Sequence, residues 1–145
     1  MFIGKVSELT GEIYGVVCRL VPQLGAHKVI PTQDDLTALL NSEASTLLVA
    51  RYPDEESKIV GILTISIYQV PTGVRSIVED VIVDSSVRRR GIAKALMKAA
   101  IEIARDAGAN GVALTSNFQR VEANLMYQNM GFAKRETNTY FYKLK

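Results

Sequence analysis

The clearest pattern along the chain is a pair of long runs of branched apolar residues near its middle. The runs IVGILTISIYQV, residues 59–70, and RSIVEDVIVD, residues 75–84, are rich in Val and Ile, which favour β-strands. The segment PTG that separates them is short enough for a hairpin connection. We therefore expect the two runs to form neighbouring antiparallel strands.

The segment before this hairpin predicts two helices and a strand. Residues 7–24 carry apolar side chains at helical spacing, although two glycines and a proline weaken the pattern. Thr32 and Asp35 resemble a capping box, which indicates a second helix that starts at Thr32. TLLVARY, residues 46–52, is typical of a strand.

The segment after the hairpin alternates between helix and strand patterns. Residues 91–107 repeat apolar positions every three or four residues, and Gly108 is expected to end this helix as a left-handed cap. A strand at 111–116, a helix at 121–130 and a last strand at 139–144 follow. This order predicts an α/β or α+β fold with a mixed sheet and helices on both faces.

Composition limits the class of protein. The chain has 145 residues, 48% of them hydrophobic, which predicts a single domain over residues 1–145. Its net charge of +2 is too small to indicate a nucleic-acid partner, and no apolar run is long enough to span a membrane. A single cysteine, Cys18, and a single histidine, His27, argue against a disulfide and a His-rich metal site. With no secretion signal in the first residues, a cytoplasmic location is expected.

Three arginines stand directly before a glycine, where the second long strand gives way to a helix. A helix that begins here would direct unpaired N–H groups and the positive end of its dipole at one place, which suits a phosphate group. Gly91 would let the phosphate approach, and Arg88, Arg89 and Arg90 would add charge and hydrogen-bond donors. The cluster predicts a phosphate site; a solvated turn that only ends the strand is the alternative.

This junction resembles the hallmark of the GCN5-related N-acetyltransferase (GNAT) family, which is Arg/Gln-x-x-Gly-x-Gly/Ala after a central strand. Its positions here are Arg88, Gly91 and Ala93. A second family marker has Asn, then Tyr three residues later, then Gly-Phe, and it is similar to ANLMYQNMGF. The residues that match this marker are Asn124, Tyr127, Gly131 and Phe132. Both motifs occur in the family's order and on the expected elements, and the resemblance runs from about residue 47 to the end of the chain.

The resemblance implies direct transfer of an acetyl group from acetyl-CoA to a primary amine of a small metabolite or peptide, with no metal. The diphosphate of acetyl-CoA would lie on the amides of residues 88–93, including Ile92. The pantetheine arm would pair like an extra strand beside Val81, Ile82 and Val83, where the family splays two parallel strands. Relatives often pair through C-terminal strands, so a homodimer is expected.

The reaction needs a proton donor for the departing thiolate. Tyr127 is the predicted donor, since a phenol is neutral at pH 7 and can donate a hydrogen bond. Asn124 lies one helical turn earlier on the same face, so both side chains can point at one ligand. Asn117, at the end of the strand before this helix, is expected to contact the pantetheine or the acceptor, as in relatives.

The general base is predicted to be one of two adjacent acids, Glu79 and Asp80. Neighbours in a regular strand face opposite sides, so only one of them can face the amine. Glu79 shares its side with Val81 and Val83 unless a bulge intervenes. Two acids would be costly to bury in an apolar strand, which argues that one is functional. We favour Glu79, acting directly or through a water molecule; Asp80, or a structural role for both, are the alternatives.

Two other functions fit some of these residues. A catalytically silent acyl-CoA-binding regulatory module would use the phosphate site but would need neither Tyr127 nor the acidic pair. A nucleic-acid binder would use the three arginines but would also need an extended basic face. The sequence leaves the acceptor open among amino sugars, amino acids, polyamines, small drug-like amines and protein N-termini.

Overall fold

A computed structural model of the chain describes residues 1–145, which divide into a larger unit, Met1–Leu114, and a smaller unit, Thr115–Lys145. The larger unit contains the β-sheet and the first three α-helices, and the smaller unit contains the fourth α-helix. The single domain over residues 1–145 stays a prediction.

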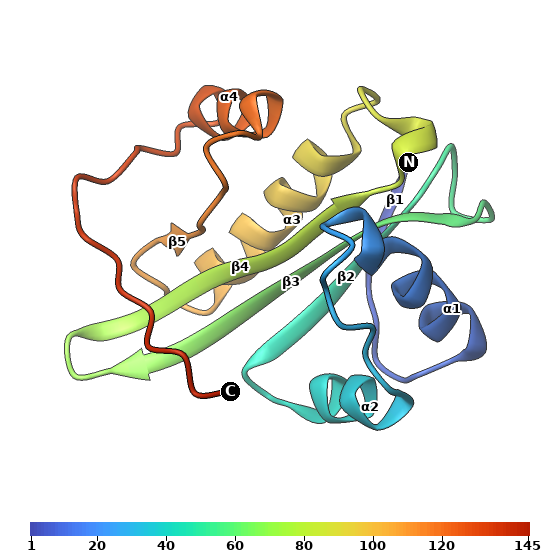
Figure 1. The fold of residues 1–145 in the computed structure, drawn as a ribbon, viewed down its shortest axis with the longest axis horizontal. Helices are drawn as coiled ribbons and strands as arrows, with labels where there is room; N and C mark the ends of the chain where they lie inside the picture. Colours follow the sequence, from blue (N-terminus) through green and yellow to red (C-terminus); the bar gives the residue numbers. More distant parts are fainter. The chain divides into compact units, whose positions relative to one another are not determined.

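A five-stranded sheet in the order β1-β2-β3-β4-β5 forms the centre of the larger unit (Figure 1). The first four strands are antiparallel neighbours, and β4 pairs with β5 in parallel. The predicted mixed sheet is thus confirmed, including the hairpin between β3 and β4. The strands are β1 (Phe2–Lys5), β2 (Ser45–Arg51), β3 (Ile59–Val70), β4 (Gly73–Val83) and β5 (Val112–Ala113).

Four α-helices and two short 3-10 helices connect and follow these strands. The capping box predicted at Thr32 and Asp35 is present, and Gly108 has the left-handed φ of 76° expected of a helix end. None of the helices combines the length and the apolar character that crossing a membrane requires. The helices are α1 (Gly11–Leu20), η1 (Val21–Gln23), α2 (Gln33–Asn41), η2 (Ser85–Val87), α3 (Ile92–Asp106) and α4 (Val121–Asn129).

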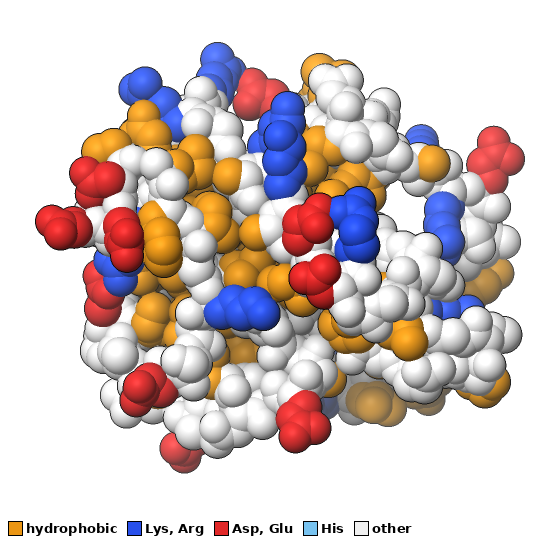
Figure 2. All heavy atoms as spheres, turned by 180° about the vertical axis from the view of Figure 1, so that it is seen from behind, with side chains coloured by type: hydrophobic (Ala, Val, Ile, Leu, Met, Phe, Trp, Pro, Cys, Tyr) orange, Lys and Arg blue, Asp and Glu red, His pale blue; other side chains and the backbone are white.

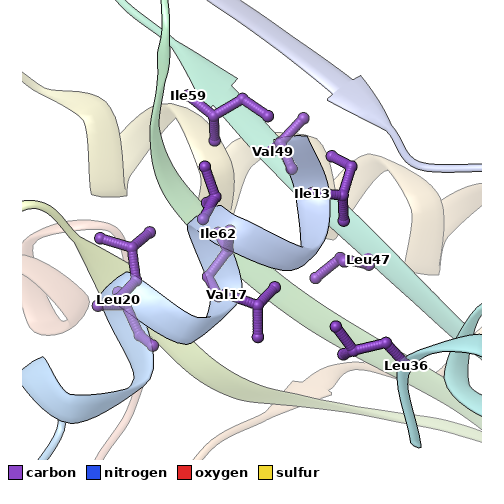
Figure 3. Packing of buried hydrophobic residues seen from close by; sticks show 10 residues of the cluster. Ile13, Val17, Leu20, Leu36, Leu47, Val49, Ile59 and Ile62 are labelled. Carbon is purple, nitrogen blue, oxygen red and sulfur yellow. The ribbon is translucent and has the colours of Figure 1, made fainter. Parts of the chain in front are cut away.

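The helices α1 and α2 cover one face of the sheet. Side chains of α1 that recur at helical spacing point down onto strand residues, and α2 adds Leu36 to the same cluster (Figure 3). The strand residues of this cluster come from β2, β3 and β4, and Leu47 and Val49 of β2 show the two-residue period of a strand. The buried members are Ile13, Val16, Val17, Leu20, Leu36, Leu47, Val49, Ile59, Ile62 and Ile82.

Helix α3 packs on the opposite face, so helices cover both faces as predicted. A glycine of β3, Gly61, lies under its first turn. A Cβ atom on Gly61 would be 3.2 Å from side-chain atoms of both Ile92 and Leu96, and 3.3 Å from the carbonyl oxygen of Ile82. Glycine therefore permits α3 to approach the sheet closely at the end where it begins. This contact sets the position of the helix terminus that the sequence predicts to bind phosphate.

Two elements differ from the prediction. The strand β1 was not predicted, because four residues are too few to show a period. The strand predicted at 139–144 is absent: residues 132–145 form neither helix nor strand, and Tyr140 and Phe141 are 91% and 90% exposed. Aromatic residues favour strands only where another strand pairs with them, and none pairs with this segment.

The substitution Gly61→Val should destabilise the protein, because its side chain would overlap Ile92, Leu96 and a backbone oxygen. We expect the free energy of unfolding to fall by about 1–3 kcal/mol, measured by urea denaturation. Gly15→Ala in α1 is the control, since a Cβ there meets nothing within 4 Å. It should instead raise stability by about 0.5–1 kcal/mol. An unchanged midpoint for Gly61→Val would show that α3 does not depend on this close contact.

Candidate functional site

The strand β4 contains a β-bulge at its acidic pair. The partners of Glu79 and Ile82 on β3 are two residues apart, whereas Glu79 and Ile82 themselves are three residues apart. Asp80 and Val81 therefore stand together against one residue of β3. Asp80 has a φ of 51°, in the left-handed region. A bulge of this kind bends the strand and redirects the side chains on either side of it.

The bulge overturns the predicted side of Glu79. Because one extra residue is inserted at Asp80, Glu79 shares a face with Ile82 and not with Val81 and Val83. Ile82 belongs to the apolar cluster beneath α1 and α2. Glu79 therefore lies on the face of the sheet that these two helices cover.

The acidic pair is not buried, contrary to the prediction. Glu79 and Asp80 are both exposed, so neither carboxylate loses its hydration on folding. Their exposure leaves them accessible to a second substrate. A role for either as general base stays a prediction.

The strand β4 has an open edge along its second half. The strand β5 pairs with β4 only at Ser76 and Ile77, whereas β4 continues to Val83. The backbone of residues 81–83 consequently has no strand partner on the β5 side. Alternate N–H and C=O groups of this segment can thus pair with an extended ligand.

The arginine turn between η2 and α3 has the backbone form that the motif predicts. Arg89 and Gly91 adopt left-handed φ values of 63° and 77°. The N–H of Ala95 donates to the carbonyl oxygen of Gly91 at 3.0 Å. The amides of Ile92 and Ala93 come before this bond in the chain, so they have no acceptor within the helix. Backbone donors and the positive dipole end therefore coincide at the turn.

The space in front of the turn is open. A Cβ on Gly91 would meet no atom within 4 Å, so its left-handed φ is the constraint that favours glycine here. The side chains of Arg88, Arg89 and Arg90 are exposed. The turn therefore offers charge and backbone donors to an anion that arrives from solvent.

Sequence reasoning missed one buried acid beside this turn, Asp84, which is 7% exposed. Its side chain caps η2: the amide of Ser86 donates to it, and so does the hydroxyl of Ser86. These bonds and the guanidinium of Arg19 hold the pKa of Asp84 below its usual range, although burial opposes them. The signal in the sequence was the triplet Asp-Ser-Ser, which is typical of a capped turn after a strand.

In the smaller unit, α4 ends in a Schellman motif that fixes Tyr127. The N–H of Phe132 donates to the carbonyl oxygen of Tyr127 at 3.0 Å, and the N–H of Gly131 to that of Gln128 at 3.0 Å. Gly131 has the required positive φ, 101°. The ring of Phe132 meets that of Tyr127 edge-on, with centroids 5.9 Å apart. The Tyr-to-Gly-Phe marker therefore encodes the end of α4, and the hydrogen bonds and ring contact of this helix end hold Tyr127 in place.

Tyr127 is held in its neutral form. It is 6% exposed, and burial raises the pKa of its phenol, although the charge of Arg120 acts in the opposite direction. A buried phenol that stays protonated at neutral pH can donate its proton in a reaction.

The two predicted asparagines of the smaller unit lie together. The side-chain nitrogen of Asn124 donates to the carbonyl oxygen of Asn117 at 3.0 Å. The side-chain oxygen of Asn117 accepts from the amide of Gln119 at 2.9 Å. Both therefore shape the turn before α4, which is a structural role that the sequence did not predict. Their contact with a ligand stays a prediction.

The chain has no cluster of metal-ligating side chains, and the charges on one of its faces are mixed in sign. No group of three or more His, Cys, Asp or Glu side chains could hold a metal ion. On the face shown in Figure 2, basic and acidic side chains are interspersed, and neither sign covers a continuous area.

A model of the acetyltransferase (GNAT) family matches residues 12–132. The chain belongs to this family. The resemblance inferred from the arginine junction and from the Asn-Tyr-Gly-Phe marker is confirmed, and membership supports the predicted enzyme class, an N-acetyltransferase.

Solved structures share the fold over almost the entire chain. An aminoglycoside acetyltransferase from an uncultured soil metagenomic sample is 24% identical, with a TM-score of 0.83 over 99% of this chain and 96% of that chain. An acetyltransferase of Trypanosoma brucei is 21% identical, with a TM-score of 0.76 over 98% and 99% of the two chains. A transcriptional regulator from Bacillus halodurans is 23% identical, with a TM-score of 0.79 over 98% and 100%. These TM-scores show a common fold.

A human protein, N-acetyltransferase 8, matches a shorter stretch at higher identity. The two are 46% identical over 52 residues, which is 36% of this chain and 23% of the human protein. The match thus spans under a quarter of that relative's length. Its substrates are therefore no guide to the acceptor of this chain.

Proposed function

We propose that the protein is an acetyl-CoA-dependent N-acetyltransferase that moves the acetyl group directly to a primary amine of a small molecule or a peptide. One observation carries the proposal: the start of α3, with its amides and three exposed arginines, follows a strand whose edge is open. A diphosphate suits the first feature, and an extended amide chain suits the second. Acetyl-CoA contains both groups in this order.

The cofactor would bind mainly through backbone groups. The amides of residues 88–93, in particular Ile92 and Ala93, would hold the diphosphate, with Arg88 and Arg90 on its outer oxygens. The pantetheine amides would pair with β4 along residues 81–83, with Asn117 and Asn124 as further contacts. No step of the reaction requires a metal.

The chemistry is an acyl transfer. The lone pair of the neutral amine attacks the thioester carbon, so a C–N bond forms and the carbonyl oxygen takes up negative charge. When this intermediate collapses, the C–S bond breaks and the sulfur leaves with the electron pair. Tyr127 would give its proton to that sulfur, and the nitrogen would lose its proton to a base. The products are an amide and free CoA.

The base would be Glu79 or Asp80, directly or through water. We expect the helix pair α1 and α2 to help select the acceptor. Glu79 is favoured because it lies on the face of the sheet that these helices cover. Two exposed carboxylates also attract an acceptor that arrives as a cation.

The cytoplasmic location and the homodimer are further predictions that come from the sequence and the family resemblance.

A silent acyl-CoA-binding module is the second candidate, because a protein named as a transcriptional regulator shares the fold. Release of free thiol from acetyl-CoA over a broad panel of amines separates the two. Turnover with any amine supports the enzyme, and CoA binding without turnover on the whole panel supports the module.

The substitution Gly91→Glu should abolish CoA binding, measured by calorimetry, because it adds a negative charge where the diphosphate would lie. Gly108→Glu at the other end of α3 is a matched control. It has nearly the same φ, 76° against 77°, and the same open space around a Cβ. Both variants should lose similar stability, but Gly108→Glu should keep its CoA affinity. Normal binding by Gly91→Glu would remove the phosphate site.

Replacing Tyr127 by Phe should lower kcat by about 100-fold, since a positioned proton donor contributes about that much or more. CoA affinity and the melting temperature should stay close to normal, because the ring still packs on Phe132. The measurement is steady-state turnover with a good amine, under conditions in which the chemical step limits the rate. An unaltered rate there would exclude Tyr127 as the donor.

The variant Glu79→Gln should reduce kcat/KM for the amine, and the loss should be greatest at lower pH. At low pH most of the amine is charged and must lose a proton before it attacks, so the reaction depends most on a base. Asp80→Asn should have the smaller effect. pH-rate profiles of both variants decide the assignment: the reverse order makes Asp80 the base, and two normal profiles leave proton removal to water.

A further inference from the structure

Asp84 is the one acidic residue that the fold buries, and it lies where β4 turns toward the arginines. Apart from Tyr127 with its phenol, Ser76 is the only other residue with a polar side chain that is buried to this degree. A carboxylate that leaves water needs protein groups to replace its hydration. Neither the acyl-transfer chemistry nor the two sequence motifs account for this residue.

The carboxylate of Asp84 belongs to a hydrogen-bond network that joins three separate elements. One oxygen accepts from the amide and the hydroxyl of Ser86, at 3.1 and 3.0 Å. The other oxygen forms an ion pair with Arg19 on α1. Arg19 also donates to the carbonyl oxygen of Ile59 at 3.0 Å. The network thus ties α1 and the start of β3 to the turn that follows β4.

Backbone hydrogen bonds hold the same turn. The N–H of Asp84 donates to the carbonyl oxygen of Val60 at 2.7 Å, and that of Val87 to the carbonyl oxygen of Asp84 at 3.1 Å. The N–H of Ser85 donates to the side chain of Gln23, in η1, at 3.0 Å. The chain is therefore fixed at every residue from Asp84 to Val87, and the arginine turn begins at the next one.

We propose, on the basis of the proposed function, that Arg19 and Asp84 are positioning residues for the diphosphate of acetyl-CoA. They act through the turn: Asp84 fixes one end of the arginine loop, while the packing of α3 on Gly61 fixes the other. The amides between them are then arranged before the ligand arrives, which lowers the cost of binding. Arg19 also neutralises a carboxylate whose charge would repel the diphosphate.

The test compares two acetyl donors in the variant Asp84→Asn, which keeps the shape of the side chain but loses the charge that holds Arg19. We expect the Kd for CoA by calorimetry, and the KM for acetyl-CoA, to rise about tenfold or more, with kcat nearly unchanged. S-acetylpantetheine contains the thioester and the arm but no diphosphate. The variant and the natural protein should use this donor with equal kcat/KM. Equal losses with both donors would indicate a general defect and overturn the proposal.

A second ion pair provides the matched control. Arg51 and Glu12 also link α1 to the sheet, with 2.6 Å between nitrogen and oxygen, but through β2 and away from the turn. Glu12→Gln should therefore leave the Kd for CoA unchanged. If it weakens CoA binding as much as Asp84→Asn does, the anchoring of α1 in general is responsible, and the specific role of Asp84 is refuted.

The outcomes separate this inference from the proposed function. A natural protein that binds no CoA contradicts the proposed function. If the natural protein binds CoA and the Asp84→Asn variant binds it with equal affinity, this result contradicts only the positioning role.

If Asp84→Asn does not fold, the variant Ser86→Ala replaces it in the test, because it removes one hydrogen bond to the same carboxylate. It should weaken CoA binding about threefold, and unchanged affinity would overturn the proposal.

Discussion

The contact between the first turn of α3 and Gly61 is the constraint on which the candidate site depends. A helix terminus can bind an anion only if its amides are held at a defined place, and the sheet provides that place. Because Gly61 has no side chain, Ile92 and Leu96 settle directly against β3. Burial of the Ile92 and Leu96 side chains therefore fixes the start of α3 on the sheet. The direction of the backbone amides in the turn follows from this, although the amides themselves do not contact the sheet.

The bulge of β4 and its open edge lie within a few residues of each other. The strand pairs with β3 throughout its length, but its register shifts by one residue at Asp80. The shift twists the strand, and on its other side the pairing with β5 stops at Ile77. Free backbone groups and an acid directed toward α1 and α2 thus occur within a few residues. Ligand-binding features of this kind are expected where regular pairing ends.

Side-chain periodicity predicted most of the fold but little of the site's exact geometry. The bounds of β3, the capping box at Thr32 and the helix after Gly91 agree with the sequence because each depends on neighbours a few residues away. The bulge was missed because one inserted residue leaves the apolar pattern almost intact. The pair of Arg19 and Asp84 was missed because 65 residues separate its members, and only the tertiary fold shows that they meet.

The two family motifs were informative for a physical reason: each records a backbone requirement. At the arginine junction, glycine is needed for a φ of 77°, and a small residue follows where the helix terminus must remain open. At the end of α4, glycine allows the reversal that brings Phe132 back onto Tyr127. We expect acceptor selection to have no such backbone requirement, because it would depend on side chains of α1 and α2. The backbone requirements recorded in the two motifs therefore indicate the enzyme class, but they do not indicate which amine accepts the acetyl group.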